Sequence, residues 1–133
     1  MLTARADRVG ESAVVRVLVV DDDARVRRGL RAVIERSADL LIAGEAATPG
    51  QALELDLALQ PDVAVVDLLL PRATDGMGLV AALKVRGRPV IAISMRASLQ
   101  RRALAVGADV FLVKDGLLVD DLIGGIHAVA AGR

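Results

Sequence analysis

Five residues that could take part in phosphate and metal chemistry stand directly after short apolar runs of the sequence. Asp21 and Asp22 follow the first such run, and Asp67, Ser94 and Lys114 each follow a later one. Carboxylates are the oxygen ligands that Mg²⁺ prefers, and a lysine pairs with a phosphate as a point charge. Because phosphoryl transfer depends mainly on positioning and charge neutralisation, this set of residue types suits that reaction.

The apolar runs that precede these residues have the composition of buried strands. They are short and rich in β-branched residues, a pattern typical of strands covered on both faces. We expect strands over residues 15–20, 40–43, 63–66, 89–93 and 110–113.

Helical patterns separate the expected strands. Thr48 and Pro49 favour a helix start, as N-cap and first helical residue. Asp75 and Gly76 predict a turn ahead of a short helix over residues 79–85, and residues 98–106 predict another helix. Two further helices carry apolar residues on one face: Val26, Leu30, Val33 and Ile34 in the first, and Leu118, Leu122, Ile126 and Val129 in the last.

Alternation of strands and helices favours an α/β domain with a parallel sheet, helices on both faces and right-handed crossovers. Such sheets place their chemistry beyond the carboxyl ends of their strands, at a topological switch point. The three acids, the hydroxyl and the lysine would all project from this same edge, so we expect them to form one site.

Composition narrows the possible functions. The 133 residues are 54% hydrophobic and suit one domain, and Lys plus Arg equal Asp plus Glu at 17 each, which disfavours nucleic-acid binding. The absence of cysteine excludes disulfides, thiol catalysis and cysteine-bound metal. A single aromatic residue, Phe111, argues against base-stacking platforms. No apolar run reaches the ~20 residues of a membrane span, and no secretory signal is visible, so we expect a cytoplasmic location and no membrane partner.

Several stretches resemble the receiver domains of response regulators, the CheY-like superfamily, over roughly residues 15–131. They are VLVVDD (17–22), VVDLLLP (65–71), AIS (92–94) and GADVFLVKD (107–115). GLRAVIE (29–35), AGEA (43–46) and the Lys-Asp pair at 114–115 are most similar to regulators with a LuxR/NarL-type helix-turn-helix output. The resemblance implies a flavodoxin-like doubly wound (βα)5 fold with strand order 2-1-3-4-5. Residues 1–13 are polar and small and show no periodicity, which predicts a flexible leader, so we expect a receiver domain over residues 14–133 and no output domain.

The resemblance assigns a role to each site residue. Asp67 is the expected phosphoacceptor, and Asp21, Asp22, Asp67 and the backbone carbonyl of Leu69 are the expected Mg²⁺ ligands. Lys114 is expected to pair with the carboxylate and then with the phosphate.

A conformational switch is also implied by the resemblance. Ser94 would donate its hydroxyl to the phosphoryl group, and Phe111 stands where the family has its switch aromatic. The expected partners are a sensor histidine kinase, a second copy of the chain bound through the C-terminal helix region, and DNA only through an output domain absent from the chain. Such a domain is not an enzyme on other substrates, because it catalyses only its own phosphorylation and dephosphorylation.

Simpler roles exist for many of these residues. Asp23 is expected to cap the first helix, Ser94 could satisfy backbone groups, Phe111 could be core packing, and Lys114 could be an ordinary surface lysine. His127 is expected on a helix surface without a cluster of partners. A solvated face, or less readily a kinase-docking face, is expected for the arginines at Arg25, Arg27, Arg28 and Arg31.

Three departures from the family pattern concern the surroundings of the acceptor. Met95 stands where a small residue is usual, and Leu69 where polar residues are frequent. The segment 71–75 is one residue longer than usual, which predicts a rearranged loop. Our hypothesis is that Met95 and Leu69 shield the site and prolong the phosphorylated state.

Other classes of function remain open. A pseudo-receiver would bind partners without phosphorylation, although the complete set of site residues argues against it. A metal-dependent phosphatase or phosphotransferase of the haloacid-dehalogenase type would need a second Asp where Leu69 stands. A flavodoxin-type cofactor module would need phosphate-cradling loops and flavin-stacking aromatics, which this sequence lacks.

Overall fold

A computed structural model of the chain describes residues 14–69, 73–115 and 118–132. Within these residues lies one parallel sheet with the order β2-β1-β3-β4-β5, so the predicted fold class and strand order are confirmed. Its strands are β1 (Val15–Val20), β2 (Leu40–Ala46), β3 (Val63–Asp67), β4 (Val90–Ser94) and β5 (Val110–Val113). β1 and β3 are neighbours at the centre, which makes their carboxyl ends the switch point of the sheet.

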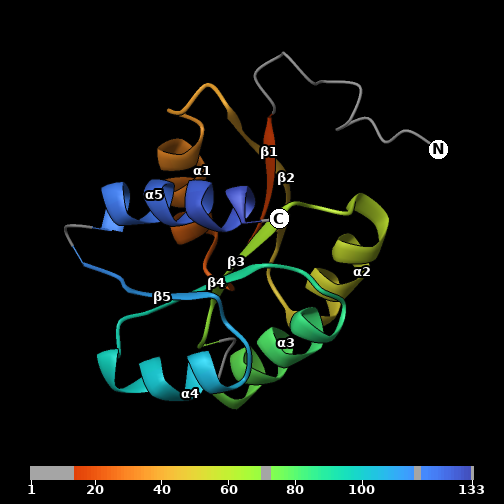
Figure 1. Cartoon of the computed structure of the whole chain (residues 1–133), viewed down its shortest axis with the longest axis vertical. Helices are drawn as coiled ribbons and strands as arrows, with labels where there is room; N and C mark the ends of the chain where they lie inside the picture. The colour runs from red at the N-terminus through yellow and green to blue at the C-terminus, as the bar shows by residue number, and fades with distance from the viewer. Residues whose placement is uncertain (1–13, 70–72, 116–117, 133) are drawn as a thin grey trace.

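Helices cover both faces of the sheet (Figure 1). α1 (Ala24–Ile34) and α5 (Leu118–Ala131) lie on one face. The other face carries α2 (Pro49–Leu59), α3 (Ala73–Val85) and α4 (Gln100–Ala105), with the 3₁₀ turn η2 (Ala97–Leu99) directly before α4. None of the helices in the described part of the chain is both long and apolar enough to cross a membrane.

Two apolar layers hold the helices against the sheet. Val17 and Val19 pack on the side of α1 and α5, whereas Leu18 and Val20 pack on the opposite side. All four are completely buried. Burial on both sides explains why β1 reads as a continuous apolar run rather than an alternating one.

Predicted helix caps are confirmed at two places. The Asp23 carboxylate accepts a hydrogen bond from the Arg25 N–H (2.8 Å) at the start of α1. The Thr48 hydroxyl accepts one from the Gln51 N–H (3.1 Å), and Pro49 is the first residue of α2. These bonds satisfy N–H groups that a helix leaves free in its first turn.

Several predicted boundaries are wrong. β2 continues three residues beyond the expected end and reaches Ala46, and β4 runs one residue later than expected. The helix expected over residues 98–106 is divided into η2 and α4. The predicted leader (1–13) lies outside the described residues, as do residues 71 and 72 of the segment 71–75 in which a rearranged loop was predicted.

The turn predicted at Asp75 and Gly76 is also wrong, because α3 begins at Ala73 and includes both residues. Gly76 is buried against the segment that follows β3. A Cβ atom at position 76 would lie 1.9 Å from the Leu68 carbonyl oxygen. The glycine is therefore needed for close packing of a helix against backbone rather than for a turn.

We predict that Gly76→Ala destabilises the chain, by about 1–3 kcal/mol in the free energy of unfolding, because the new methyl group overlaps backbone atoms that cannot rotate away. Gly78→Ala is the matched control in the same helix, since nothing lies within 4 Å of its Cβ position. The control should gain up to about 1 kcal/mol from helix propensity. Urea unfolding of both variants measures the difference, and equal effects would contradict the packing described here.

Candidate functional site

The carboxyl ends of β1, β3 and β5 bring an acidic cluster against one lysine. The Lys114 Nζ lies 3.1 Å from Asp21 Oδ2 and 3.2 Å from Asp67 Oδ2. One carboxylate oxygen from each of Asp21, Asp22 and Asp67 lies within 4.8 Å of the others. The structure thus brings together four of the predicted site residues from segments far apart in the sequence.

Burial and charge act against each other in this cluster. Asp21 and Asp67 are only 1% and 6% exposed, whereas Asp22 is exposed to solvent. Burial raises the pKa of Asp67, and the charge of Asp21 raises it further, while Lys114 and the Leu69 N–H only partly offset this. Burial alone would lower the pKa of Lys114, but the charges of Asp67 and Asp21 outweigh it and the pKa is raised. Lys114 is therefore a firmly protonated cation, and ionised Asp67 is held at an energetic cost.

The donor set of the cluster fits a hard divalent cation. Three carboxylates face one ammonium group, so ionised carboxylates leave an excess of negative charge. Mg²⁺ binds through a few carboxylates and keeps several waters, which an exposed ligand such as Asp22 permits. Leu69, two residues after Asp67, donates its N–H to Asp67 Oδ1 at 3.2 Å and so lies beside the cluster.

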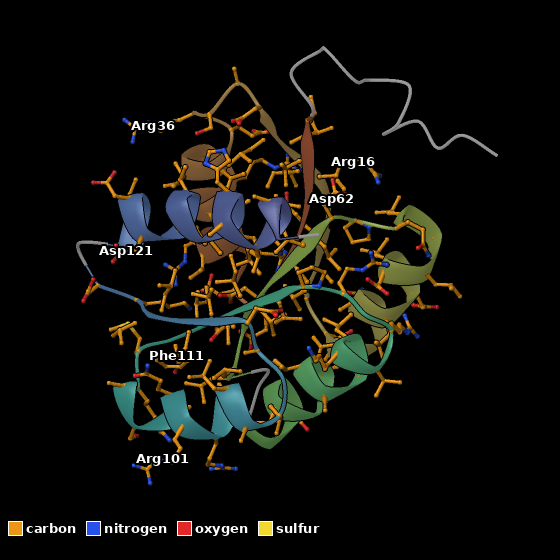
Figure 2. All side chains as sticks on the ribbon, in the orientation of Figure 1. Arg16, Arg36, Asp62, Arg101, Phe111 and Asp121 are labelled. Atoms are coloured by element: carbon orange, nitrogen blue, oxygen red, sulfur yellow. The ribbon has the colours of Figure 1, made fainter. Side chains whose placement is uncertain are left out.

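The two predicted switch residues occupy different environments. Ser94 is completely buried at the end of β4, and its hydroxyl oxygen accepts a hydrogen bond from the Arg96 N–H (3.0 Å). That contact agrees with the simpler role of satisfying backbone and leaves the hydroxyl hydrogen free to be donated elsewhere. Phe111 is half-buried on β5 near α4 (Figure 2) and packs against the core on that side. Their switch roles remain predictions.

The expected arginine face is only partly correct. Arg25 and Arg28 are exposed, but Arg27 and Arg31 turn toward Glu45 on β2. These ion pairs join a helix to a strand, so no local sequence pattern predicts them.

His127 lies on α5 with its side chain 42% exposed. Its Nε2 lies 2.9 Å from a single carboxylate oxygen, Asp39 Oδ2, which agrees with the expected position on a helix surface without a cluster of partners.

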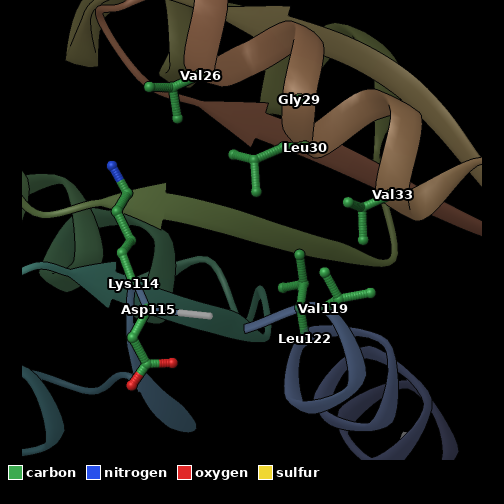
Figure 3. Close-up of a pocket in the computed structure, with 8 residues that line it drawn as sticks. All are labelled: Val26, Gly29, Leu30, Val33, Lys114, Asp115, Val119 and Leu122. Atoms are coloured by element: carbon green, nitrogen blue, oxygen red, sulfur yellow. The ribbon is translucent and has the colours of Figure 1, made fainter. Parts of the chain in front are cut away.

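An apolar groove runs between α1 and α5 and reaches Lys114 (Figure 3). Val26, Leu30 and Val33 line it from α1. Val119 and Leu122 line it from α5, and Asp115 stands beside Lys114. The apolar spacing of the first and last helices predicted these faces, and the structure shows that they leave part of the surface between them open.

Comparison with known proteins identifies the family. Residues 17–123 match the family model described as "Response regulator receiver domain", and the chain belongs to this family. The nitrate/nitrite response regulator protein NarL of Escherichia coli is 32% identical over 121 residues, which cover 88% of this chain and 55% of that protein. A protein-glutamate methylesterase/protein-glutamine glutaminase of Symbiobacterium thermophilum is 35% identical over 130 residues, covering 88% of this chain and 36% of that protein.

Structural comparison agrees with this assignment. The receiver domain of a putative response regulator NarL from Mycobacterium tuberculosis has a TM-score of 0.81 and 33% identity, over 91% of this chain and 99% of that one. The chain is thus a CheY-like receiver domain related to the LuxR/NarL regulators, as the resemblance predicted. It spans about half the length of the curated NarL and about a third of the methylesterase.

We predict that Asp67→Asn stabilises the chain at neutral pH in the presence of EDTA. Folding raises the pKa of Asp67 above its ordinary value, so ionised Asp67 lowers the free energy of unfolding at a pH above the raised pKa. This loss of stability disappears as the pH falls through the raised pKa toward the ordinary pKa, because the carboxyl group becomes protonated. The gain should be on the order of 1 kcal/mol in the free energy of unfolding and should shrink at lower pH. Urea unfolding over a pH series measures it, with the exposed Asp120→Asn as control. A loss of stability in Asp67→Asn at neutral pH would contradict the prediction.

Proposed function

We propose that this chain is the phosphoacceptor of a two-component response regulator, with Asp67 receiving a phosphoryl group from a sensor histidine kinase. The observation that carries the proposal is the contact of Lys114 Nζ with both Asp21 and Asp67, beside the exposed carboxylate of Asp22. This arrangement supplies a nucleophile, a cation for the incoming phosphate, and oxygen ligands for Mg²⁺ within one edge of the sheet.

In the proposed reaction, a carboxylate oxygen of Asp67 attacks the donor phosphorus. A new P–O bond forms, the bond between phosphorus and the donor breaks, and the bonding electron pair leaves with the donor. Lys114 pairs first with the free carboxylate and then with the phosphoryl oxygens. Bound Mg²⁺, held by Asp21, Asp22, Asp67 and the Leu69 carbonyl, would supply charge neutralisation for the phosphoryl group. The product is an acyl phosphate on the protein itself, so the chain acts on no other substrate.

The phosphorylated chain would then switch conformation. Ser94 would donate its hydroxyl to the phosphoryl group, and Phe111 would change its packing near α4, a population shift driven by the new charge on Asp67. We propose that the output is transcriptional regulation through a DNA-binding helix-turn-helix domain, as in LuxR/NarL-type regulators. Self-association through the C-terminal helix region remains a prediction.

Incubation with acetyl phosphate and Mg²⁺ tests the proposed function, because the nucleophile, the lysine and the metal ligands all belong to this chain. Intact-mass spectrometry should show a phosphate-sized increase that requires Mg²⁺ and is absent in Asp67→Asn. Absence of an adduct after rapid quenching, together with absence of Mg²⁺ binding, would instead favour the pseudo-receiver class.

A long-lived phosphorylated state is a further expectation for this site. Met95, directly after Ser94, is 67% exposed, and the half-buried Leu69 lies beside Asp67. Both apolar side chains would hinder a water molecule that attacks the acyl phosphate. We therefore expect Leu69→Asn and Met95→Ala each to shorten its lifetime several-fold, measured as loss of the mass adduct with time. Val85→Ala, at an exposed apolar position far along α3, is the control, and unchanged lifetimes in both site variants would contradict the shielding.

A further inference from the structure

The second turn of α1 holds an arginine that joins the acidic cluster to a neighbouring strand. Arg27 Nη1 donates a hydrogen bond to the backbone carbonyl of Asp21 at 2.6 Å. Its Nε lies 3.4 Å from Glu45 Oε1, and the side chain is only 19% exposed. The other carboxylate oxygen of Glu45 lies 2.6 Å from Arg31, so both oxygens of Glu45 are engaged by arginines. Arg27 is thus held between the carboxylate of Glu45 and the backbone of Asp21, the first residue after β1.

A β-bulge in β2 is what turns Glu45 toward α1. Val17 pairs with Ile42, but the next residue, Leu18, pairs with Gly44, so Ala43 is an extra residue in β2. Side chains alternate between the faces of a strand, and a one-residue insertion exchanges the faces for everything that follows. Ile42 packs in the core on the side of α1 and α5, whereas Ala46 packs in the core on the opposite side.

Regular alternation would have placed Ala46 on the same side as Ile42 and would have directed Glu45 away from α1. The bulge therefore brings a carboxylate to the α1 face at the edge of the sheet that carries the acidic cluster. Bulges next to active sites commonly redirect one side chain in this manner.

The polar groups of Asp21 are all held by other residues. Its N–H donates to the Ala46 carbonyl (3.0 Å), and its carbonyl accepts from Arg27. Its Oδ1 accepts from the Asp23 N–H (2.9 Å), and its Oδ2 contacts Lys114. Of these bonds to Asp21, the one from Arg27 is made by a side chain of α1, and it adds to the hydrogen bonds that the backbone N–H groups of Arg25 and Arg27 donate to Asp23.

We propose that Arg27, held in place by Glu45, is a positioning residue for the cation site. It fixes the turn that presents the carboxylates of Asp21 and Asp22, and this inference rests on the proposed function, since that function requires the cation. Groups that orient metal ligands without touching the metal typically change metal affinity by about 10- to 100-fold when removed. A purely structural brace between α1 and β2 would instead affect stability and leave the affinity unchanged.

Isothermal titration calorimetry with Mg²⁺ alone, on the full chain, tests the inference. Arg27→Met should weaken Mg²⁺ binding by about tenfold. Arg28→Met is the matched control, because Arg28 is the exposed neighbour on the same helix and the change in charge is identical. Urea unfolding in EDTA shows whether each variant is folded and how much stability it has lost, so a change in affinity is separated from a change in stability.

Glu45→Gln provides a second, nearly isosteric variant. It should weaken Mg²⁺ binding in the same direction, and the double variant with Arg27→Met should bind no more weakly than Arg27→Met alone, because both changes disable one unit. Equal Mg²⁺ affinity in folded Arg27→Met and Arg28→Met, or in Glu45→Gln and the wild type, would overturn the positioning role. Failure of the wild-type chain itself to bind Mg²⁺ would overturn the proposed function.

Discussion

The burial of two neighbouring carboxylates, Asp21 and Asp67, carries an energetic cost that the rest of the structure has to offset. The ammonium group of Lys114 contacts both carboxylates, but the pKa of Asp67 is still raised, mainly because of burial, with the charge of Asp21 adding to it. Strands buried on both faces supply the rigidity that keeps these groups together. Because the charges of the cluster are incompletely balanced, binding of a cation or addition of a phosphoryl group would change its energy strongly, as the proposed two-state switch requires.

At the opposite edge of the sheet, a buried carboxylate is neutralised by arginines of the same chain. Asp56 near the end of α2 is completely buried, yet it pairs with both Arg86 and the buried Arg88, and Arg88 also donates to the Pro61 carbonyl. Those charges are satisfied within the protein. At the carboxyl edge, by contrast, the exposed Asp22 leaves the cluster open to solvent. The open edge is therefore the one suited to exchange of ligands.

The apolar composition of the strands was sufficient to predict a parallel sheet, because it depends on local sequence. Four residues of the cluster could be predicted because parallel sheets place their chemistry at the carboxyl ends of their strands. Features set by contacts between distant segments escaped prediction. The start of α3 depends on Gly76 fitting against the Leu68 backbone. The extension of β2 depends on a bulge that breaks the two-residue period, and without that bulge the ion pair between Arg27 and Glu45 cannot be inferred.

The position of the phosphoryl group on the chain can be determined chemically. Reduction of the phosphorylated chain with borohydride converts an acyl-phosphate aspartate to homoserine, and peptide mass mapping identifies its position. We expect conversion at Asp67 and not at the neighbouring Asp62 or Asp75, which are controls within the same chain. Conversion at another aspartate, with Asp67 left unconverted, would contradict the assignment of Asp67 as the acceptor.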